Sequence, residues 1–185
     1  MNEILNLMRL DTSCTVHAKT WQISSFFIEK LINKAIEEEP SRVLIIDTKG
    51  NFAHKTELKS KCEVVSAIKL VYENKNFRDT DKPVYVDLSA NKLTKSDLNI
   101  VLAKLSEYTG HLGKNKIFIT SLDGWNSELI KLMNNMNITA TIEINSAGID
   151  PDESRYQNII FDGFIYGQYK YNGLVKEFDL FDTKA

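Results

Sequence analysis

The chain has 185 residues and is 43% hydrophobic, which suits one globular domain, residues 1–185, with a substantial core. Its 23 basic and 25 acidic residues leave a net charge of −2, which excludes a global basic field of the kind that announces nucleic-acid binding. Two distant cysteines and three scattered histidines argue against a disulfide framework or a metal site, and the lack of a long apolar run predicts an intracellular, soluble protein.

The amino-terminal elements are predicted from short patterns. Residues 3–10, EILNLMRL, form an apolar run that predicts a first strand, followed by the polar loop DTSCTVHA. A helix is predicted to begin near Lys19, because apolar residues then recur at helical spacing until Pro40 ends the segment. The run RVLIIDTKGNF contains four successive apolar residues, Val43 to Ile46, which is typical of a strand covered on both faces in a parallel sheet.

Later segments continue this alternation of helix and strand. A helix is predicted at residues 63–74, a strand at PVYVDLS, a helix at residues 95–109 and strands at KIFITSL and TATIEIN. The last segment, NIIFDGFIYGQYKYNGLVKEFDLF, alternates apolar and polar positions between glycines, which indicates antiparallel hairpins. We therefore expect an α/β fold with a mostly parallel central sheet, flanking helices and antiparallel carboxyl-terminal strands.

Residues 13–20, SCTVHAKT, end in the lysine and threonine that close a phosphate-binding loop. Ser13 and Ala18 stand where G-x-x-x-x-G-K-[ST] requires glycines, whose freedom lets backbone amides turn toward phosphates, so tight ATP binding is not expected. Lys19 and Thr20 keep the residue types that contact the outer phosphates and magnesium, and Asp87 ends PVYVD where a metal-positioning acid would lie. These three are predicted as a vestigial nucleotide site, although each is also an ordinary helix-start or strand-end residue.

The order of these elements resembles the core of RecA-like recombinases. SCTVHAKT resembles their phosphate loop, RVLIIDTKGNF their second core strand with its IDTEG-type turn, PVYVDLSAN their metal-binding strand, and KIFITSL the strand before their second DNA loop. Both loop glycines are missing, and Lys49 replaces the acid of the turn. The chain therefore resembles a divergent, non-catalytic recombinase paralogue, most like a Shu-complex subunit of the Csm type and next of the Psy type.

The resemblance implies a single RecA-like domain without catalysis or cofactor, which acts in the nucleus in homologous recombination and DNA repair. It implies pairing with a second RecA-like subunit, assistance to the recombinase and sequence-independent, salt-sensitive DNA binding. A first DNA loop would follow Asp87 and offer Lys92 and Lys95, and a second would offer Lys131. Trp125, in the second loop, is assigned to a protein interface in preference to base stacking.

Aromatic residues crowd the carboxyl-terminal segment more densely than one sheet face easily hides. Because tyrosine and phenylalanine are favoured in interface cores, we predict partner contacts at Phe164, Tyr166 and Tyr169 and a heterodimeric protein. The short amino terminus is a second candidate interface, since recombinase subunits join through a strand from a neighbour.

Two other functions fit the same pattern. In one, Lys19, Thr20 and Asp87 still hold Mg-ATP, and the chain is a nucleotide-binding ATPase or switch. In the other, it is a structural RecA-like subunit of another complex, such as the Elongator accessory ring. Similarity of fold cannot choose among them, because function depends on the site.

Overall fold

A computed structural model of the chain describes residues 1–66, 69, 80–89, 97, 100, 101, 103, 104, 116–120, 139–144, 156–163 and 165–181. Within them the strands are β1 (Cys14–Ala18), β2 (Val43–Asp47), β3 (Glu63–Ser66), β4 (Val84–Asp87), β5 (Lys116–Thr120), β6 (Thr139–Ile144), β7 (Gln157–Phe161), β8 (Tyr166–Tyr171) and β9 (Leu174–Asp179). The helices are α1 (Asn2–Leu7), α2 (Trp21–Glu38) and α3 (Thr56–Ser60), with a 3₁₀ turn, η1 (Pro40–Arg42).

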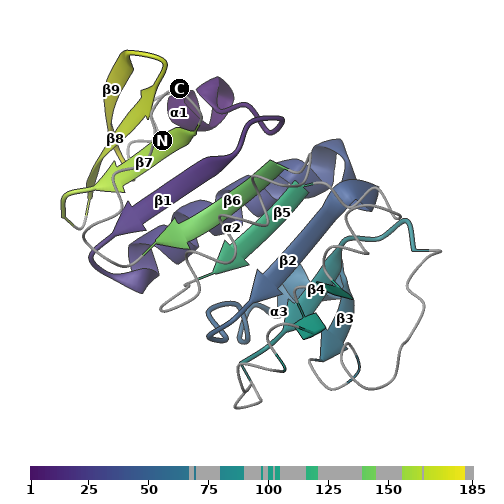
Figure 1. The fold of residues 1–185 in the computed structure, drawn as a ribbon. Coiled ribbons are helices and arrows are strands. Elements are labelled where there is room, and N and C mark those ends of the chain that lie inside the picture. Colours follow the sequence, from purple (N-terminus) through teal and green to yellow (C-terminus); the bar gives the residue numbers. More distant parts are fainter. Residues whose placement is uncertain are drawn as a thin grey trace.

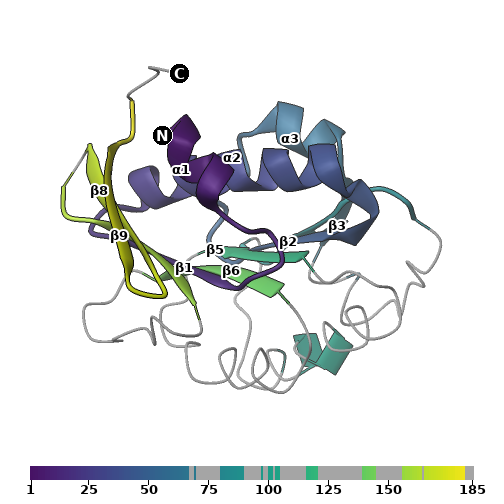
Figure 2. The same ribbon diagram turned by 90° about the horizontal axis from the view of Figure 1, so that it is seen from above.

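The described strands form one sheet in the order β3-β4-β2-β5-β6-β1-β7-β8-β9 (Figure 1). All neighbouring pairs from β3 to β7 are parallel, and β7–β8 and β8–β9 are antiparallel. In Figure 2, α1, α2 and α3 lie on one side of this sheet, and the short helical stretch around residue 100 lies on the other. The predicted α/β fold with a mostly parallel sheet and antiparallel carboxyl-terminal strands is confirmed.

The amino-terminal predictions are wrong in two places. Residues 3–10, predicted as a strand, lie mostly in α1, because Ile4 and Met8 are one helical turn apart and are both buried, at 0% and 4% exposure. The predicted loop is largely the central strand β1, in which Cys14 belongs to the core with α2. The polar Thr15 of β1 is accommodated because its hydroxyl donates to Asn158 Oδ1 of β7 at 2.5 Å.

Helix α2 covers the central strands with a stripe of buried side chains and begins at Trp21, close to the predicted start. The apolar members of the stripe are Ile23, Phe27, Ile28, Leu31, Ile32 and Ala35. They recur at spacings of three and four residues, which is the amphipathic pattern read from the sequence. Burial of these side chains contributes about 25 cal/mol per Å² of apolar surface removed from water.

Three phenylalanines close the core at the antiparallel end of the sheet. Phe27 and Phe161 have ring centroids 5.7 Å apart, and Phe161 and Phe178 are 5.6 Å apart, both in edge-on geometry. The rings meet where β8 carries Gly167, and a Cβ there would lie only 2.6 Å from Phe178 Cζ and 3.0 Å from Phe161. Gly167 is therefore required by close packing.

The remaining predictions are partly confirmed. Strands at β2, β4, β5 and β6 are confirmed, and the described residues of the predicted helix at 95–109 are helical. Residues 63–66 of the predicted helix 63–74 instead form β3, whose first residue, Glu63, donates its N–H to Pro83 O at 2.8 Å, and α3 was not predicted. The hairpin between β8 and β9 is confirmed: it turns at Asn172 and Gly173, whose φ values of 49° and 77° fit a type I′ turn.

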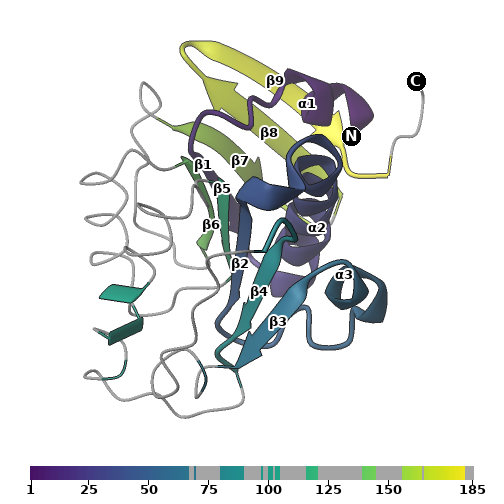
Figure 3. The same ribbon diagram turned by 90° about the vertical axis from the view of Figure 1, so that its right-hand side faces the viewer.

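The two ends of the sheet are covered differently. Figure 3 shows α1 beside β9 at one end and α3 beside β3 at the other. The amino-terminal ammonium donates to Asp179 O of β9 at 3.1 Å, and Glu3 of α1 pairs with Lys176 of β9. Among the described helices, none is long and apolar enough to cross a membrane.

Candidate functional site

The carboxyl ends of the parallel strands lie along one edge of the sheet, where open α/β sheets place their binding and functional loops. At this edge β2 and β5 are neighbours, although the chain continues from β2 toward β3 and β4 and from β5 toward β6. Such a reversal of direction is a topological switch point, the usual position of a site. Asp47 and Thr120 end the two strands there, and Asp87 ends the next strand, β4.

Asp47 is fully buried, and each of its carboxylate oxygens accepts two hydrogen bonds. Oδ1 accepts from the Thr120 hydroxyl at 2.8 Å and from Asn51 N–H at 2.9 Å. Oδ2 accepts from the Tyr85 hydroxyl at 2.6 Å and from Phe52 N–H at 2.8 Å. These four hydrogen bonds offset the free-energy cost of burying the carboxylate. The Asp47 side chain therefore has a structural role, because it joins β2 to β4, to β5 and to the turn after β2.

The Tyr85 hydroxyl is a hydrogen-bond donor to the Asp47 carboxylate in this cluster. Burial, and then the hydrogen bond and negative charge of Asp47, raise the pKa of the Tyr85 phenol far above its ordinary value. The Nζ of Lys59 lies 5.2 Å from the centroid of the Tyr85 ring and donates to Ala53 O at 2.9 Å. Lys59 therefore covers the ring without competing for the phenol.

Backbone contacts extend the cluster to the next residues of the chain. Leu88 N–H donates to Asp47 O at 2.9 Å. Thr48 N–H donates to the Thr120 hydroxyl oxygen at 3.2 Å, and the Thr48 hydroxyl donates to Thr120 O at 2.5 Å. We call Asp47, Thr48, Tyr85, Leu88 and Thr120 the Asp47 clamp, because together they join the carboxyl ends of β2, β4 and β5.

The turn after β2 is fitted closely to the end of β4. Gly50 has a φ of 76°, and a Cβ there would lie 2.9 Å from Ser89 Oγ. Ser89 in turn donates from its N–H and its hydroxyl to Asp87 Oδ1, at 3.0 and 2.6 Å. The glycine of the DTKGN run therefore has a packing reason as well as a conformational one.

The predicted phosphate-loop relic does not have the shape of a loop. Strand β1 ends at Ala18 and α2 begins at Trp21, so only Lys19 and Thr20 connect them. The preceding residues of SCTVHAKT pair with β6 and β7, and their backbone amides are used in the ladder. Lys19 is exposed, whereas the hydroxyl of Thr20 is buried and has no hydrogen-bond partner among the described residues.

Asp87 does not join Lys19 and Thr20. Four steps between neighbouring strands separate β4 from β1, through β2, β5 and β6. Because neighbouring strands lie roughly 4.8 Å apart, the two strand ends are roughly 19 Å apart. A magnesium ion bound to the phosphates at Thr20 would be too far away for the Asp87 carboxylate. The predicted three-residue nucleotide site is therefore not assembled.

The part of the chain that the structure describes contains no group of three or more histidine, cysteine or acidic side chains placed to share a metal ion. No protein-family model matches the chain, and no curated protein matches it either.

The predicted DNA-contacting lysines, Lys92, Lys95 and Lys131, lie outside the described residues, as do Trp125 and Phe164. The described chain ends at Ser89 before the first pair and at Thr120 before the third. Both of these residues belong to the carboxyl edge, one beside the Asp47 clamp and one within it.

The predicted partner contacts separate into two kinds. Tyr169 is 2% exposed, and its hydroxyl donates to the buried Gln157 Oε1 at 3.2 Å, so its assignment to an interface is wrong. Tyr166, two residues earlier on β8, is 70% exposed and stays a predicted contact. Among the described residues 165–181, the other exposed large apolar side chains are Ile165, Leu174, Val175 and Phe181.

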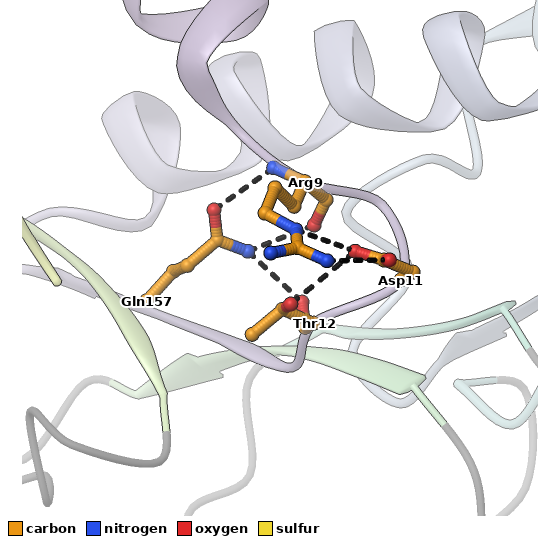
Figure 4. A network of polar contacts seen from close by, with 4 residues as sticks. All are labelled: Arg9, Asp11, Thr12 and Gln157. Atoms are coloured by element: carbon orange, nitrogen blue, oxygen red, sulfur yellow. Dashed lines mark hydrogen bonds and ion pairs between the residues drawn. The ribbon is translucent and has the colours of Figure 1, made fainter. Parts of the chain in front are cut away.

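Gln157 fastens the amino-terminal segment to the protein's own sheet (Figure 4). Its buried side chain accepts from Arg9 N–H at 2.9 Å and donates to Arg9 O at 2.8 Å and to Thr12 O at 3.0 Å. Arg9 also forms an exposed two-bond ion pair with Asp11. The segment is held in its own chain as a helix and a clamped loop, so the expectation of an amino-terminal strand offered to a neighbour is wrong.

The Asp47 clamp was missed at the level of sequence, although two signals pointed toward it. The runs VLIID, VYVD and KIFIT each place a polar residue at the end of a buried strand, and parallel strands bring such ends to one edge. A tyrosine inside a buried strand, such as Tyr85, also requires a partner for its hydroxyl. Only the strand order identifies that partner as Asp47.

Proposed function

We propose that the chain is a non-catalytic RecA-like subunit that binds DNA and a partner subunit and promotes recombinase filament assembly in homologous recombination and repair. The α/β sheet with its antiparallel carboxyl-terminal strands supports this reading. One observation supports the non-catalytic part of this proposal. Residues 14–18 of SCTVHAKT form the buried strand β1, and only Lys19 and Thr20 lie between β1 and α2.

The separation of Asp87 from β1 supports the same conclusion and weighs against the nucleotide switch. A phosphate cradle needs several consecutive free amides at a helix start, and here residues 14–17 pair with strands on both sides and Ala18 pairs with β7. Labelled ATP with magnesium is therefore expected not to bind the purified protein at micromolar concentrations. Micromolar binding that is abolished by Lys19→Ala, and preserved in the matched surface variant Lys30→Ala, would contradict the proposal.

DNA contact is proposed at the carboxyl edge, through Lys92, Lys95 and Lys131. Three lysine–phosphate contacts predict an affinity that falls with salt, with a log–log slope to which each contact adds about −0.9 on duplex DNA. The test is the affinity of the full chain for labelled duplex and single-stranded oligonucleotides over a series of salt concentrations, alone and with its partner. A flat slope, or a triple alanine variant that binds like the original chain, would contradict the DNA-binding role.

The partner surface is proposed at the β8–β9 end, where Tyr166 and the tip residues Leu174 and Val175 are exposed. A tagged chain is expected to retain a second RecA-like subunit from nuclear extracts, and Tyr166→Ala is expected to weaken that association. If the retained partner belongs instead to a tRNA-modification complex such as Elongator, the structural-subunit alternative replaces the recombination role.

A further inference from the structure

We propose that β9 is a docking edge for an extended, basic strand of the partner subunit, which joins the sheet beside β9 as its next strand. The inference rests on the proposed partner-binding role, and it names the backbone groups and the chemistry through which that partner binds. β9 is the last strand in the sheet order, so one of its sides pairs with β8 and the other has no strand beside it among the described residues (Figure 1).

The directions of the β9 backbone groups follow from the hairpin. Leu174 directly follows the two-residue turn, so it belongs to a hydrogen-bonded pair with β8, and such pairs recur at every second residue. Leu180 N–H continues the series by donating to Ile165 O at 2.8 Å. The even-numbered residues of β9 therefore bond β8, and the N–H and C=O groups of Val175 and Glu177 point away from it.

We call these outward groups of Val175 and Glu177 the β9 edge. Val175 is 57% exposed, Glu177 is exposed too, and no described residue bonds the outward N–H or C=O groups of either. The edge stops at Asp179, whose C=O accepts from the amino-terminal ammonium. Two N–H and two C=O groups are thus available to a strand added by β-augmentation.

The side chains along the β9 edge differ between its two faces, because successive side chains of a strand alternate between faces. Phe178 packs against Phe27 of α2 with ring centroids 6.0 Å apart, so it lies on the face that α2 covers. Leu174, 50% exposed, lies on the same face, whereas Glu177 and Asp179 lie on the opposite one. An added strand therefore meets an apolar side chain on one face and two carboxylates on the other.

The two carboxylates favour a basic strand. Glu177 accepts from Gln168 Nε2 at 3.3 Å and Asp179 from Phe181 N–H at 2.8 Å, and neither forms an ion pair with a described lysine or arginine. The same face of the hairpin carries one described lysine, Lys170, against these two carboxylates, so its formal charge is negative. A lysine or arginine opposite Glu177 would form a cross-strand pair of opposite charges.

A second copy of this chain is a poor occupant of the β9 edge. Symmetric antiparallel pairing of two β9 strands places one residue opposite itself. If that residue is Lys176 or Glu177, like charges stand directly opposite each other, which destabilises the pair. If it is Val175, Glu177 already faces the turn residue Gly173 of the other copy, and the ladder is short. Charge thus disfavours self-pairing but not a strand of opposite charge.

The first experiment uses the full chain and defined peptides. The probe is a short peptide that alternates lysine and valine, compared with a glutamate–valine peptide and with a lysine–valine peptide N-methylated at every second residue. Hydrogen exchange of single amides is followed by NMR. The lysine–valine peptide is expected to slow exchange at Val175 and Glu177 by about tenfold or more, while Lys176 and Phe178, whose N–H groups already bond β8, change little. The two comparison peptides should give no such protection.

The second experiment changes the β9 edge. Val175→Pro removes one outward N–H and keeps the bonds to β8, since proline is tolerated on the open side of an edge strand. It is expected to weaken binding of the lysine–valine peptide and of the co-purifying subunit about tenfold, and Val175→Ala, which keeps the N–H, should weaken them less. Glu177→Lys should weaken both as well. Asp162→Lys, which reverses an exposed acid outside β9, is the matched control and should bind like the original chain.

The possible failures are distinguishable. If the chain retains a RecA-like subunit but no peptide protects the β9 edge, or the glutamate–valine peptide protects it equally, the docking inference fails and the partner-binding proposal stands. If no RecA-like subunit is retained and the lysine–valine peptide still protects the edge, the proposed function fails and the docking edge stands. Protection that appears only as the concentration of the chain itself rises would identify a second copy as the occupant and overturn the inference. Should Val175→Pro not fold, the N-methylated peptide tests the same hydrogen bonds without a change in the chain.

Discussion

The Thr120 hydroxyl donates a 2.8 Å hydrogen bond to Asp47 Oδ1, and so joins the carboxyl ends of two parallel strands from distant parts of the chain. Both residues are fully buried. The bond lies at the point where the chain reverses its order across the sheet, which is where α/β proteins commonly build their sites. In this protein the position is occupied by a polar cluster in which the Asp47 carboxylate accepts hydrogen bonds from groups of the protein itself.

Asp47→Asn is expected to destabilise the fold by about 2 to 4 kcal/mol, because one carboxylate oxygen becomes an amide that faces two donors. Asp87→Asn is the matched control: its single accepting oxygen, which bonds Ser89, is retained in asparagine. Urea unfolding of both variants measures the difference. Equal midpoints for the two would show that the Asp47 carboxylate contributes no more to stability than the half-buried carboxylate of Asp87.

Gly167→Ala is expected to destabilise the fold by about 1 to 3 kcal/mol, because its methyl group would press on the packed rings of Phe178 and Phe161. Gly163→Ala serves as the comparison, since a Cβ there meets nothing within 4 Å. Thermal unfolding followed by near-ultraviolet circular dichroism reports on both stability and ring packing. A Gly167→Ala variant as stable as Gly163→Ala would show that the rings move aside without cost.

Gln157→Met is expected to release the segment before β1, because the variant leaves Arg9 N–H, Arg9 O and Thr12 O without their buried partner. Cleavage by trypsin after Arg9 should become at least about tenfold faster, as local opening becomes cheaper by more than about 1.4 kcal/mol. Gln168→Met, which loses only an exposed bond to Glu177, should leave the cleavage rate unchanged. If trypsin cleaves Gln157→Met no faster than the original chain, the segment before β1 is held by the contacts of α1 and not by Gln157.

Stability is expected to fall in mild acid through His17. Burial lowers the pKa of His17 below its ordinary value of 6.5, so the folded state holds the neutral ring while the unfolded state accepts a proton near pH 6.5. The contribution is present above the unfolded pKa and is lost as the pH falls through 6.5 toward the folded pKa. The urea midpoint measured from about pH 8 to about pH 5 should drop more steeply than in His17→Gln. If the urea midpoints of the original chain and of His17→Gln fall in parallel as the pH is lowered, protonation of the His17 ring is not the source of the lost stability.

Continuous apolar runs determine the parallel core from the sequence alone. Residues 43–46 favour a strand buried on both faces, and the spacing along residues 21–38 favours an amphipathic helix; the structure has both. The pair Asn172 and Gly173 likewise predicts the final hairpin, since both tolerate a positive φ. In these segments local preference and tertiary packing agree.

The secondary structure of the short or polar segments depends on the parts of the chain that pack or pair with them. Residues 3–10 are compatible with a strand or a helix in the sequence alone, and the burial of Ile4 and Met8 in the core accompanies the helix. CTVHA reads as a loop until β6 and β7 pair with it and Asn158 meets Thr15. A single sequence does not show which distant chain supplies such partners.

The sequence by itself determined the long, strongly patterned elements, the class of the fold and the absence of glycine at positions 13 and 18. Only the tertiary structure decided the strand order, and with it which strand ends meet. That order separates Asp87 from Lys19 and Thr20, and it surrounds Asp47 with Tyr85 and Thr120. The physical reason is that propensity and periodicity act over a few residues, whereas a buried polar group is satisfied by whatever strand the fold places beside it.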